Sequence, residues 1–327
     1  MNNTKKMILP SLSISITDIC NLNCIYCPPY GENLIRCDNM CKLESIIELV
    51  NLISEYKLPV IRITGGEPLL FPERVIEILR MGKKLSTTKF ILNTNGTKVL
   101  ENIDLLEDFK DIFLMKISLD TTNENIFDDM TRTNKQYPIV LKGLEQCIQR
   151  GFRIEINSVL TQKNIGEILD VIEYADNNGI DIKLFGVNNF EGKVNSEILY
   201  TPIDQLIVSL DNKYIKCEKE GLPGDRGIQM LKYKTKNDNR ILIVDHNKKS
   251  RFNKGKKTYS KFCKTCRYYP CASGMFSVTL RSDGLLQTCR MRPEKGINIS
   301  GLNTTEIKDI ISTILEPYSE CYIKEED

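Results

Sequence analysis

Strand and helix patterns alternate through the first 190 residues, and this alternation limits the folds open to the chain. Each strand pattern is a short apolar or alternating run, and each is followed by apolar residues at helical spacing. Such β-then-α units of about thirty residues predict a parallel sheet with right-handed crossovers. Strands are expected at residues 11–17, 60–64, 90–94, 112–120, 153–160 and 181–185, and helices at 43–56, 72–85, 104–109, in segments up to 150, and at 164–177.

Six units are too few for a closed eight-stranded barrel. The predicted fold is therefore α/β, a curved and open partial (β/α)6 barrel of the TIM type over residues 8–195. After Asn195 the rhythm changes. Residues 222–227 are expected to form a turn or loop and residues 241–246 a short strand. Residues 277–281 and 285–288 flank Asp283-Gly284, a pattern typical of a hairpin. Residues 196–327 are predicted to form a smaller α+β domain.

Composition excludes several classes of protein. The chain has 327 residues, of which 41% are hydrophobic and 27% charged, so it is neither disordered, collagen-like nor a coiled coil. No window approaches the roughly eighteen uninterrupted apolar residues of a membrane span, and the first residues do not follow the pattern of a signal peptide. A cytoplasmic location and no membrane partner are therefore expected.

Basic residues gather between Lys232 and Arg267, where thirteen Lys or Arg stand against two acidic residues. Such a run is most simply a solvated loop. It is also a surface that can attract an anionic substrate or an acidic peptide. Its aromatic residues are not regularly interleaved with the basic ones, so a nucleic-acid partner is not expected.

The cysteines of this sequence cluster in two groups. Because thiols stay reduced in the cytoplasm, clustered cysteines are more typical of metal ligands than of disulfides. Cys20, Cys24 and Cys27, spaced C-x3-C-x2-C, directly follow the first strand. In a β/α barrel the loops after the strands form the functional face. Three thiolates can hold three irons of a cubane and leave the fourth open, which suits a catalyst. The alternative is a zinc knuckle with a distant fourth ligand.

A glycine pair follows the second strand, in Thr64-Gly65-Gly66-Glu67-Pro68. Glycines allow a ligand to approach the backbone closely. Because this loop lies one strand away from the cysteines, on the same barrel face, the two motifs together predict a cofactor site.

The motifs CNLNCIYC (residues 20–27), TGGEP (64–68), NTNG (93–96) and ISLD (117–120) resemble those of the radical S-adenosylmethionine (SAM) superfamily. The resemblance covers most of the first 190 residues. It implies a 4Fe-4S cluster on Cys20, Cys24 and Cys27 whose open iron binds the amino and carboxylate groups of SAM. The reduced cluster would split SAM, and the 5′-deoxyadenosyl radical would abstract a substrate hydrogen. An electron donor such as flavodoxin or ferredoxin is implied as a partner.

The resemblance also assigns cofactor-binding roles at the ends of strands and in the loops after them. Polar residues at strand ends have a simpler explanation, since they often satisfy loop backbone groups. The expected residues are Tyr26 at the adenine, Gly65, Gly66 and Glu67 at the methionine amino group through their backbone, and Thr94, Ser118 and Asn157 as polar contacts to cofactor or substrate.

The second cysteine group resembles the auxiliary-cluster (SPASM/twitch-type) domain of the molybdenum cofactor biosynthesis protein A, or GTP 3′,8-cyclase, family. Cys263 and Cys266 form a C-x2-C pair, and Cys289 follows the Asp-Gly hairpin. The resemblance implies a second, auxiliary 4Fe-4S cluster. Cys271 can supply a fourth ligand, and a closed cluster favours electron transfer or a structural role. A structural zinc on the same four thiolates is the alternative.

Substrate-binding cations of the cyclase family are largely replaced in this sequence. Only Arg62 is retained, and the family's Gly-Gly tail is replaced by Lys324-Glu325-Glu326-Asp327. A triphosphate needs several cations in fixed geometry. The sequence therefore favours a peptide or small-molecule substrate, with GTP 3′,8-cyclisation as the alternative and a non-catalytic zinc or nucleic-acid-binding module as a third hypothesis. The replaced positions are Ser13, Val60, Glu155, Ser277 and Thr279.

Overall fold

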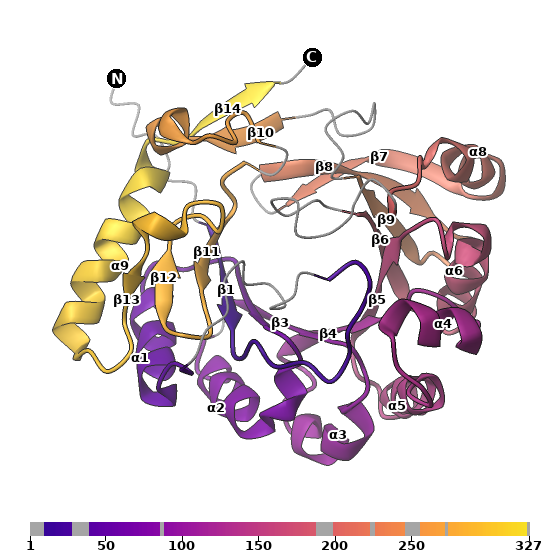
Figure 1. Cartoon of the computed structure of the whole chain (residues 1–327), viewed down its shortest axis with the longest axis horizontal. Coiled ribbons are helices and arrows are strands. Elements are labelled where there is room, and N and C mark those ends of the chain that lie inside the picture. The colour runs from indigo at the N-terminus through magenta and orange to yellow at the C-terminus, as the bar shows by residue number, and fades with distance from the viewer. Residues whose placement is uncertain are drawn as a thin grey trace.

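The structure is a computed structural model that describes residues 10–27, 39–85, 88–187, 199–222, 226–245, 256–271 and 274–325. Twelve of the described strands form one curved sheet with helices on the outer, convex face (Figure 1). The six predicted parallel strands lie side by side in chain order, which confirms the partial barrel. They are β1 (Ser11–Ser15), β2 (Val60–Thr64), β3 (Lys89–Thr94), β4 (Phe113–Ser118), β5 (Ile154–Leu160) and β6 (Asp181–Gly186).

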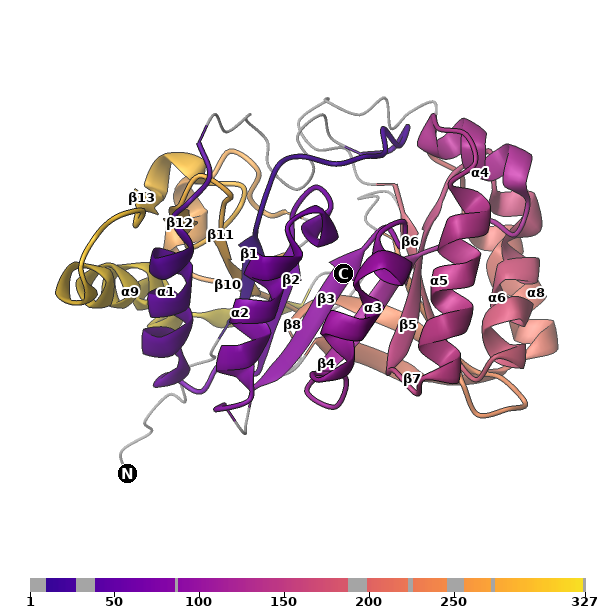
Figure 2. The same ribbon diagram turned by 90° about the horizontal axis from the view of Figure 1, so that it is seen from below.

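The outer helices lie against the sheet (Figure 2). The side chains that they bury are mostly apolar. In α1, Ile46, Leu49, Val50 and Ile53 recur at helical spacing and are buried. The helices are α1 (Leu43–Ser54), α2 (Pro72–Gly82), α3 (Val99–Glu107), α4 (Glu124–Thr131), α5 (Tyr137–Gln149), α6 (Ile168–Asn177), α8 (Asp204–Lys213) and α9 (Thr304–Ser319).

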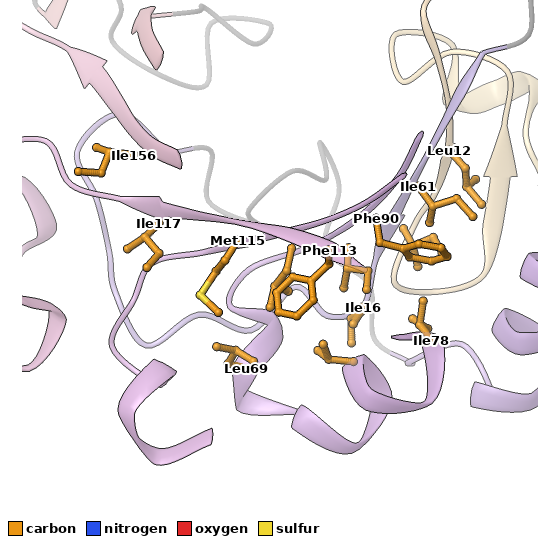
Figure 3. Close-up of a cluster of buried hydrophobic side chains, with 14 of the residues drawn as sticks. Leu12, Ile16, Ile61, Leu69, Ile78, Phe90, Phe113, Met115, Ile117 and Ile156 are labelled. Atoms are coloured by element: carbon orange, nitrogen blue, oxygen red, sulfur yellow. The ribbon is translucent and has the colours of Figure 1, made fainter. Parts of the chain in front are cut away.

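The core lies between strands and helices, where apolar strand residues such as Phe90 and Met115 meet Leu69 and Ile78 from the helical layer (Figure 3). Each fully buried side chain of this kind contributes roughly 1.5–3 kcal/mol. Because side chains alternate along a strand, the residues between these positions face the concave side of the sheet. In the strand register, Asn93 of β3 lies beside Lys116 of β4, and Lys116 lies beside Glu155 of β5.

Helix α3 begins at Val99, five residues before the predicted start. Val99, Ile103 and Leu106 are buried at helical spacing, and this apolar stripe extends the helix toward its N-terminus. Helix α6 begins at Ile168, after a short 3₁₀ helix over Ile165–Glu167.

Residues after 199 extend the sheet at both of its edges. At one edge β9 pairs with β6, followed by β8 and β7; at the other β11 pairs in parallel with β1. The hairpin expected at Asp283-Gly284 is confirmed, with Gly284 at φ +90°. The added strands are β7 (Ile215–Leu222), β8 (Arg226–Lys234), β9 (Arg240–Val244), β11 (Ser277–Leu280), β12 (Leu285–Gln287) and β13 (Ile297–Asn298), with β10 (Lys256–Tyr259) and β14 (Tyr322–Glu325) as a separate ribbon.

The C-terminal part shares its core with the barrel, since Ile307 and Ile311 of α9 belong to the same apolar cluster as Leu12 of β1. The predicted domain boundary near residue 195 lies outside the described residues. Within the described part of the chain, no helix is long and apolar enough to cross a membrane.

Candidate functional site

The first cysteine group lies on the loop that follows β1 and crosses the ends of the parallel strands toward α4 (Figure 2). The amide of Asn23 donates to the carbonyl of Thr131 over 3.0 Å, and the amide of Ile25 to Met130 over 2.9 Å. The far end of the loop is thus tied to α4. Cys20 and Cys27 are exposed and Cys24 is partly buried.

The three thiols influence one another. Burial raises the pKa of Cys24 well above its usual range, and Asp120, Cys27 and Cys20 raise it further. Burial likewise raises the pKa of Cys20, whose sulfur accepts hydrogen bonds from the amide of Leu22 (3.4 Å) and from Nδ2 of Asn95 (3.6 Å). Such thiols are protonated in the protein alone, so binding iron must release protons.

The donor set of this loop fits an iron–sulfur cluster. Among the described residues, no three His, Cys, Asp or Glu side chains are arranged to hold a single metal ion. Three thiols on one short loop suit a polynuclear iron–sulfur group, in which each thiolate binds a different iron.

Gly65 and Gly66 bring the loop after β2 directly against the cysteine loop. The amide of Gly66 donates to the carbonyl of Thr17 over 2.7 Å, and that of Glu67 to Ile19 over 2.8 Å. An added Cβ would lie 2.5 Å from the Thr17 oxygen at Gly65, and 2.2 Å from the Ile19 oxygen at Gly66. These glycines thus serve the contact between two loops. Their predicted contact to the methionine amino group stays a prediction. Because an amino group donates hydrogen bonds, the backbone carbonyl oxygens of this loop would have to accept them.

Glu67 is fully buried and joins the loops after β2 and β3. Its carboxylate accepts hydrogen bonds from the amide of Leu69 (2.9 Å), the hydroxyl of Thr94 (2.7 Å) and the amide of Asn95 (2.7 Å). Burial raises the pKa of Glu67 to about 7, against the opposing effect of these three donors. The Thr94 hydroxyl is therefore engaged by protein, and the predicted cofactor contacts of both residues stay predictions.

Tyr26 is held by Asp120, at the end of β4. Its hydroxyl donates to Oδ2 of Asp120 over 2.5 Å, while the amide of Val159 donates to Oδ1 over 2.7 Å. Burial raises the pKa of Asp120 to about 6. The Tyr26 ring keeps part of its surface exposed while its phenol oxygen is buried, so the ring has one fixed orientation beside Cys24 and Cys27. The ISLD motif contains Asp120, but its partner cannot be read from the sequence.

Three buried polar atoms on the concave face have no hydrogen-bond partner within the described structure: Oγ of Ser15, Oδ1 of Asn93 and Oδ1 of Asn157. Leaving such an atom unsatisfied costs about 1–3 kcal/mol, which a polar ligand would recover. Asn157, a predicted cofactor contact, is paired in register with Ser118, another one. Ser15 and Asn93 were not predicted. Strand alternation is the signal that identifies Asn93, since its neighbour Thr94 points to the opposite side.

The four predicted thiols of the second group lie within electrostatic reach of one another, and their role as cluster ligands stays a prediction. Burial raises the pKa of Cys289 to about 12, and the charges of Cys271, Cys263 and Cys266 act in the same direction. The amide of Gly274 donates to the sulfur of Cys271 over 3.2 Å.

The rest of the concave face is partly charged and partly apolar. Lys116 and Glu155 form an ion pair with side chains 15% and 5% exposed. Lys183 lies 5.0 Å from the centre of the Phe185 ring. Met230 of β8 and Leu242 and Val244 of β9 form an apolar patch with Phe185.

The sequence profile of the Radical SAM superfamily matches residues 14–175, which include the cysteine loop and the strands that surround it. The chain therefore carries a radical SAM superfamily domain over these residues.

Its relatives include enzymes named GTP 3′,8-cyclase. The one from Clostridium perfringens is 33% identical over 58% of this chain, and the match spans 60% of that relative's length, less than two thirds. The one from Synechocystis is 27% identical over 94% of this chain and 87% of the relative. The one from Clostridium botulinum is 29% identical over 96% of this chain and 92% of the relative.

Two solved structures share the fold. SuiB of Streptococcus suis bound to S-adenosylmethionine has a TM-score of 0.64 at 14% identity, over 94% of this chain and 68% of that one. The enzyme anSMEcpe with bound AdoMet has a TM-score of 0.58 at 17% identity, over 92% of this chain and 80% of that one.

Proposed function

We propose that Cys20, Cys24 and Cys27 hold a 4Fe-4S cluster and that SAM binds beside it at the carboxyl ends of β1, β3 and β5. The partnerless atoms of Ser15, Asn93 and Asn157 carry this proposal, since they lie on the concave face of these strands. When bound, the reduced cluster would supply one electron to SAM, which would release methionine and remove a hydrogen atom from the substrate.

The chain's own residues provide position and shielding. Asp120 fixes the Tyr26 ring where the resemblance expects the adenine. Glu67 ties the loops after β2 and β3 behind the cysteine loop, so that the three thiols keep their place. An electron donor such as flavodoxin or ferredoxin is the proposed partner.

The class-defining activity is tested by release of 5′-deoxyadenosine. The protein is reconstituted anaerobically with iron and sulfide and given dithionite and SAM. We expect 5′-deoxyadenosine from the wild type and from Cys217→Ala, a cysteine outside both groups, and none from Cys24→Ala. Release by Cys24→Ala at the wild-type rate would refute the site.

For the substrate, we propose a guanine nucleotide and a GTP 3′,8-cyclase reaction. The support is that relatives with this name match 94% and 96% of the chain. Arg62, the retained cation, faces the concave side and donates to Oγ of Ser11 over 2.8 Å. These relatives favour the nucleotide over the peptide substrate that the sequence alone favours.

A peptide or other small molecule is the second candidate, and the concave face provides the reason. Glu155 neutralises Lys116, and Met230, Leu242 and Val244 offer apolar contacts where a triphosphate needs cations. Adding GTP to the reconstituted enzyme decides between the two. Loss of GTP in step with 5′-deoxyadenosine release supports the cyclase, whereas SAM cleavage with GTP intact supports the second candidate.

We further propose that Cys263, Cys266, Cys271 and Cys289 hold a second, auxiliary 4Fe-4S cluster. Four thiol ligands leave no iron open, so this cluster would transfer electrons or stabilise the fold. Replacing Cys263, Cys266 and Cys289 by alanine together should halve the iron content, from roughly eight to four per chain for two cubanes. Unchanged iron would exclude a cluster there, and zinc without sulfide in the wild type would favour the structural alternative.

A further inference from the structure

We propose that Asn95 is a positioning residue for the first cluster, which holds the Cys20 sulfur through an N–H···S hydrogen bond and raises the cluster's reduction potential. The side-chain nitrogen of Asn95 lies 3.6 Å from the Cys20 sulfur. This inference rests on the cluster site of the proposed function and does not depend on the substrate.

The orientation of the Asn95 amide is fixed by a ring of three side chains. Oδ1 of Asn95 accepts hydrogen bonds from the amide (3.0 Å) and the hydroxyl (2.7 Å) of Thr97. Nδ2 of Asn95 donates to Oδ1 of Asn21 over 3.0 Å, and Nδ2 of Asn21 donates to the Thr97 hydroxyl over 2.8 Å. Because the oxygen of Asn95 is engaged by two donors, its nitrogen must face Asn21 and Cys20.

The backbone of Asn95 is anchored as firmly as its side chain. Its amide donates to Oε2 of Glu67 over 2.7 Å, and Glu67 is fully buried beneath the loop. The amide of Glu67 in turn donates to the carbonyl of Ile19, the residue before Cys20. Cys20 is therefore linked to Asn95 both through its sulfur and through Glu67.

A donor at a cluster sulfur has a defined electrostatic effect. Reduction adds negative charge to the cluster, and a hydrogen bond to a thiolate sulfur stabilises the more negative state. The Leu22 amide, 3.4 Å from the same sulfur, is a backbone donor that side-chain variants retain. Removing the Asn95 donor should therefore make the cluster harder to reduce without abolishing it.

The test is a redox titration of the reconstituted protein without substrate. Electron paramagnetic resonance monitors the cluster whose signal responds to SAM. We expect a more negative midpoint potential in Asn95→Ala than in the wild type, and a still more negative one in Asn95→Asp, which adds a charge. The matched control, Thr97→Ser, keeps the hydroxyl of the ring and should keep the wild-type potential.

The midpoint potential belongs to each loaded cluster, so partial iron loading does not change it. Asn95→Asp retains both acceptor contacts to Thr97 and the backbone hydrogen bond to Glu67. If Asn95→Ala binds no iron, the midpoint potential of Asn95→Asp tests the inference instead. A wild-type potential in the loaded variant would overturn the inference. A wild type with no SAM-responsive cluster would instead refute the proposed function.

Discussion

Asp120 and Glu67 show how single buried carboxylates organise this site. Both are buried, and each accepts hydrogen bonds from neighbouring loops or strands rather than from a cation. A buried carboxylate is costly to ionise, and hydrogen-bond donors recover part of that cost. The two residues therefore fix Tyr26 and Asn95 while making the local structure sensitive to pH.

Tyr26→Phe tests the bond to Asp120. The substitution leaves a buried carboxylate short of one donor, and we expect the free energy of unfolding to fall by about 1.5–3 kcal/mol. Urea denaturation measures it. The control is Tyr56→Phe, whose hydroxyl lies 3.4 Å from Ser312 at the surface, and it should change stability little. Equal effects of the two variants would contradict the buried bond.

Asp120→Asn tests the raised pKa. Burial lifts the pKa of Asp120 from 3.8 to about 6 in the folded protein, so between these values the folded state binds the proton more tightly than the unfolded state. The free energy of unfolding of the wild type should therefore fall as pH rises through this window, by at most about 3 kcal/mol in total. The asparagine variant lacks this dependence. Urea unfolding of the metal-free protein at several pH values measures it, and parallel curves would contradict the assignment.

At the scale of residues, motifs identify the thiols and loops but not the partners of polar side chains. Asn93 and Thr94 are adjacent in NTNG, yet Thr94 donates to Glu67 while Oδ1 of Asn93, on the concave face, has no partner among the described residues. Asp120 likewise holds Tyr26 across a sequence separation of 94 residues. Such contacts depend on which strands become neighbours, and a local pattern does not contain that information.

At the scale of elements, the site depends on two loops in close contact. Gly66→Ala would place a Cβ against the Ile19 carbonyl, so the loops must separate. We expect a loss of about 1–3 kcal/mol in stability together with reduced iron binding. Thermal unfolding and iron analysis measure both. Gly166→Ala, where nothing lies within 4 Å of the added atom, is the matched control. Full iron loading in Gly66→Ala would contradict the tight contact.

Strands β4 and β5 meet at the ion pair between Lys116 and Glu155. Lys116→Met leaves a buried carboxylate without its cation, and we expect a loss of about 3–5 kcal/mol. The exchanged double variant, Lys116→Glu with Glu155→Lys, should recover much of that loss because the charges still meet. Denaturant unfolding of the set measures the coupling. Losses that simply add would show that the two side chains do not interact.

Strand alternation predicts these elements well because it reflects burial directly. The six parallel strands lie where period-two or apolar runs occur, and the hairpin lies at Asp283-Gly284. Helix ends are less certain, as the early start of α3 at Val99 shows. A helix continues as long as its apolar stripe finds a surface, and that surface comes from the folded sheet.

At the scale of the whole molecule, the C-terminal part extends the sheet of the barrel at both edges. Strand β11 lies beside β1, and the turn after it bonds to the start of the cysteine loop through Ser282 and Asp18. Cys289 follows two residues after β12. The second thiol group is thus connected through one hairpin to the loop of the first. The alternation of the sequence predicts the barrel but not that β11 would extend it at β1, because this pairing joins residues more than 260 positions apart.

The central claim is a cluster at Cys20, Cys24 and Cys27 that keeps one iron open for SAM. Mössbauer spectroscopy of the reconstituted protein, with and without SAM, tests it most directly. The account predicts that one iron of a four-iron cluster becomes distinct from the other three when SAM is added. A spectrum that SAM leaves unchanged would contradict it.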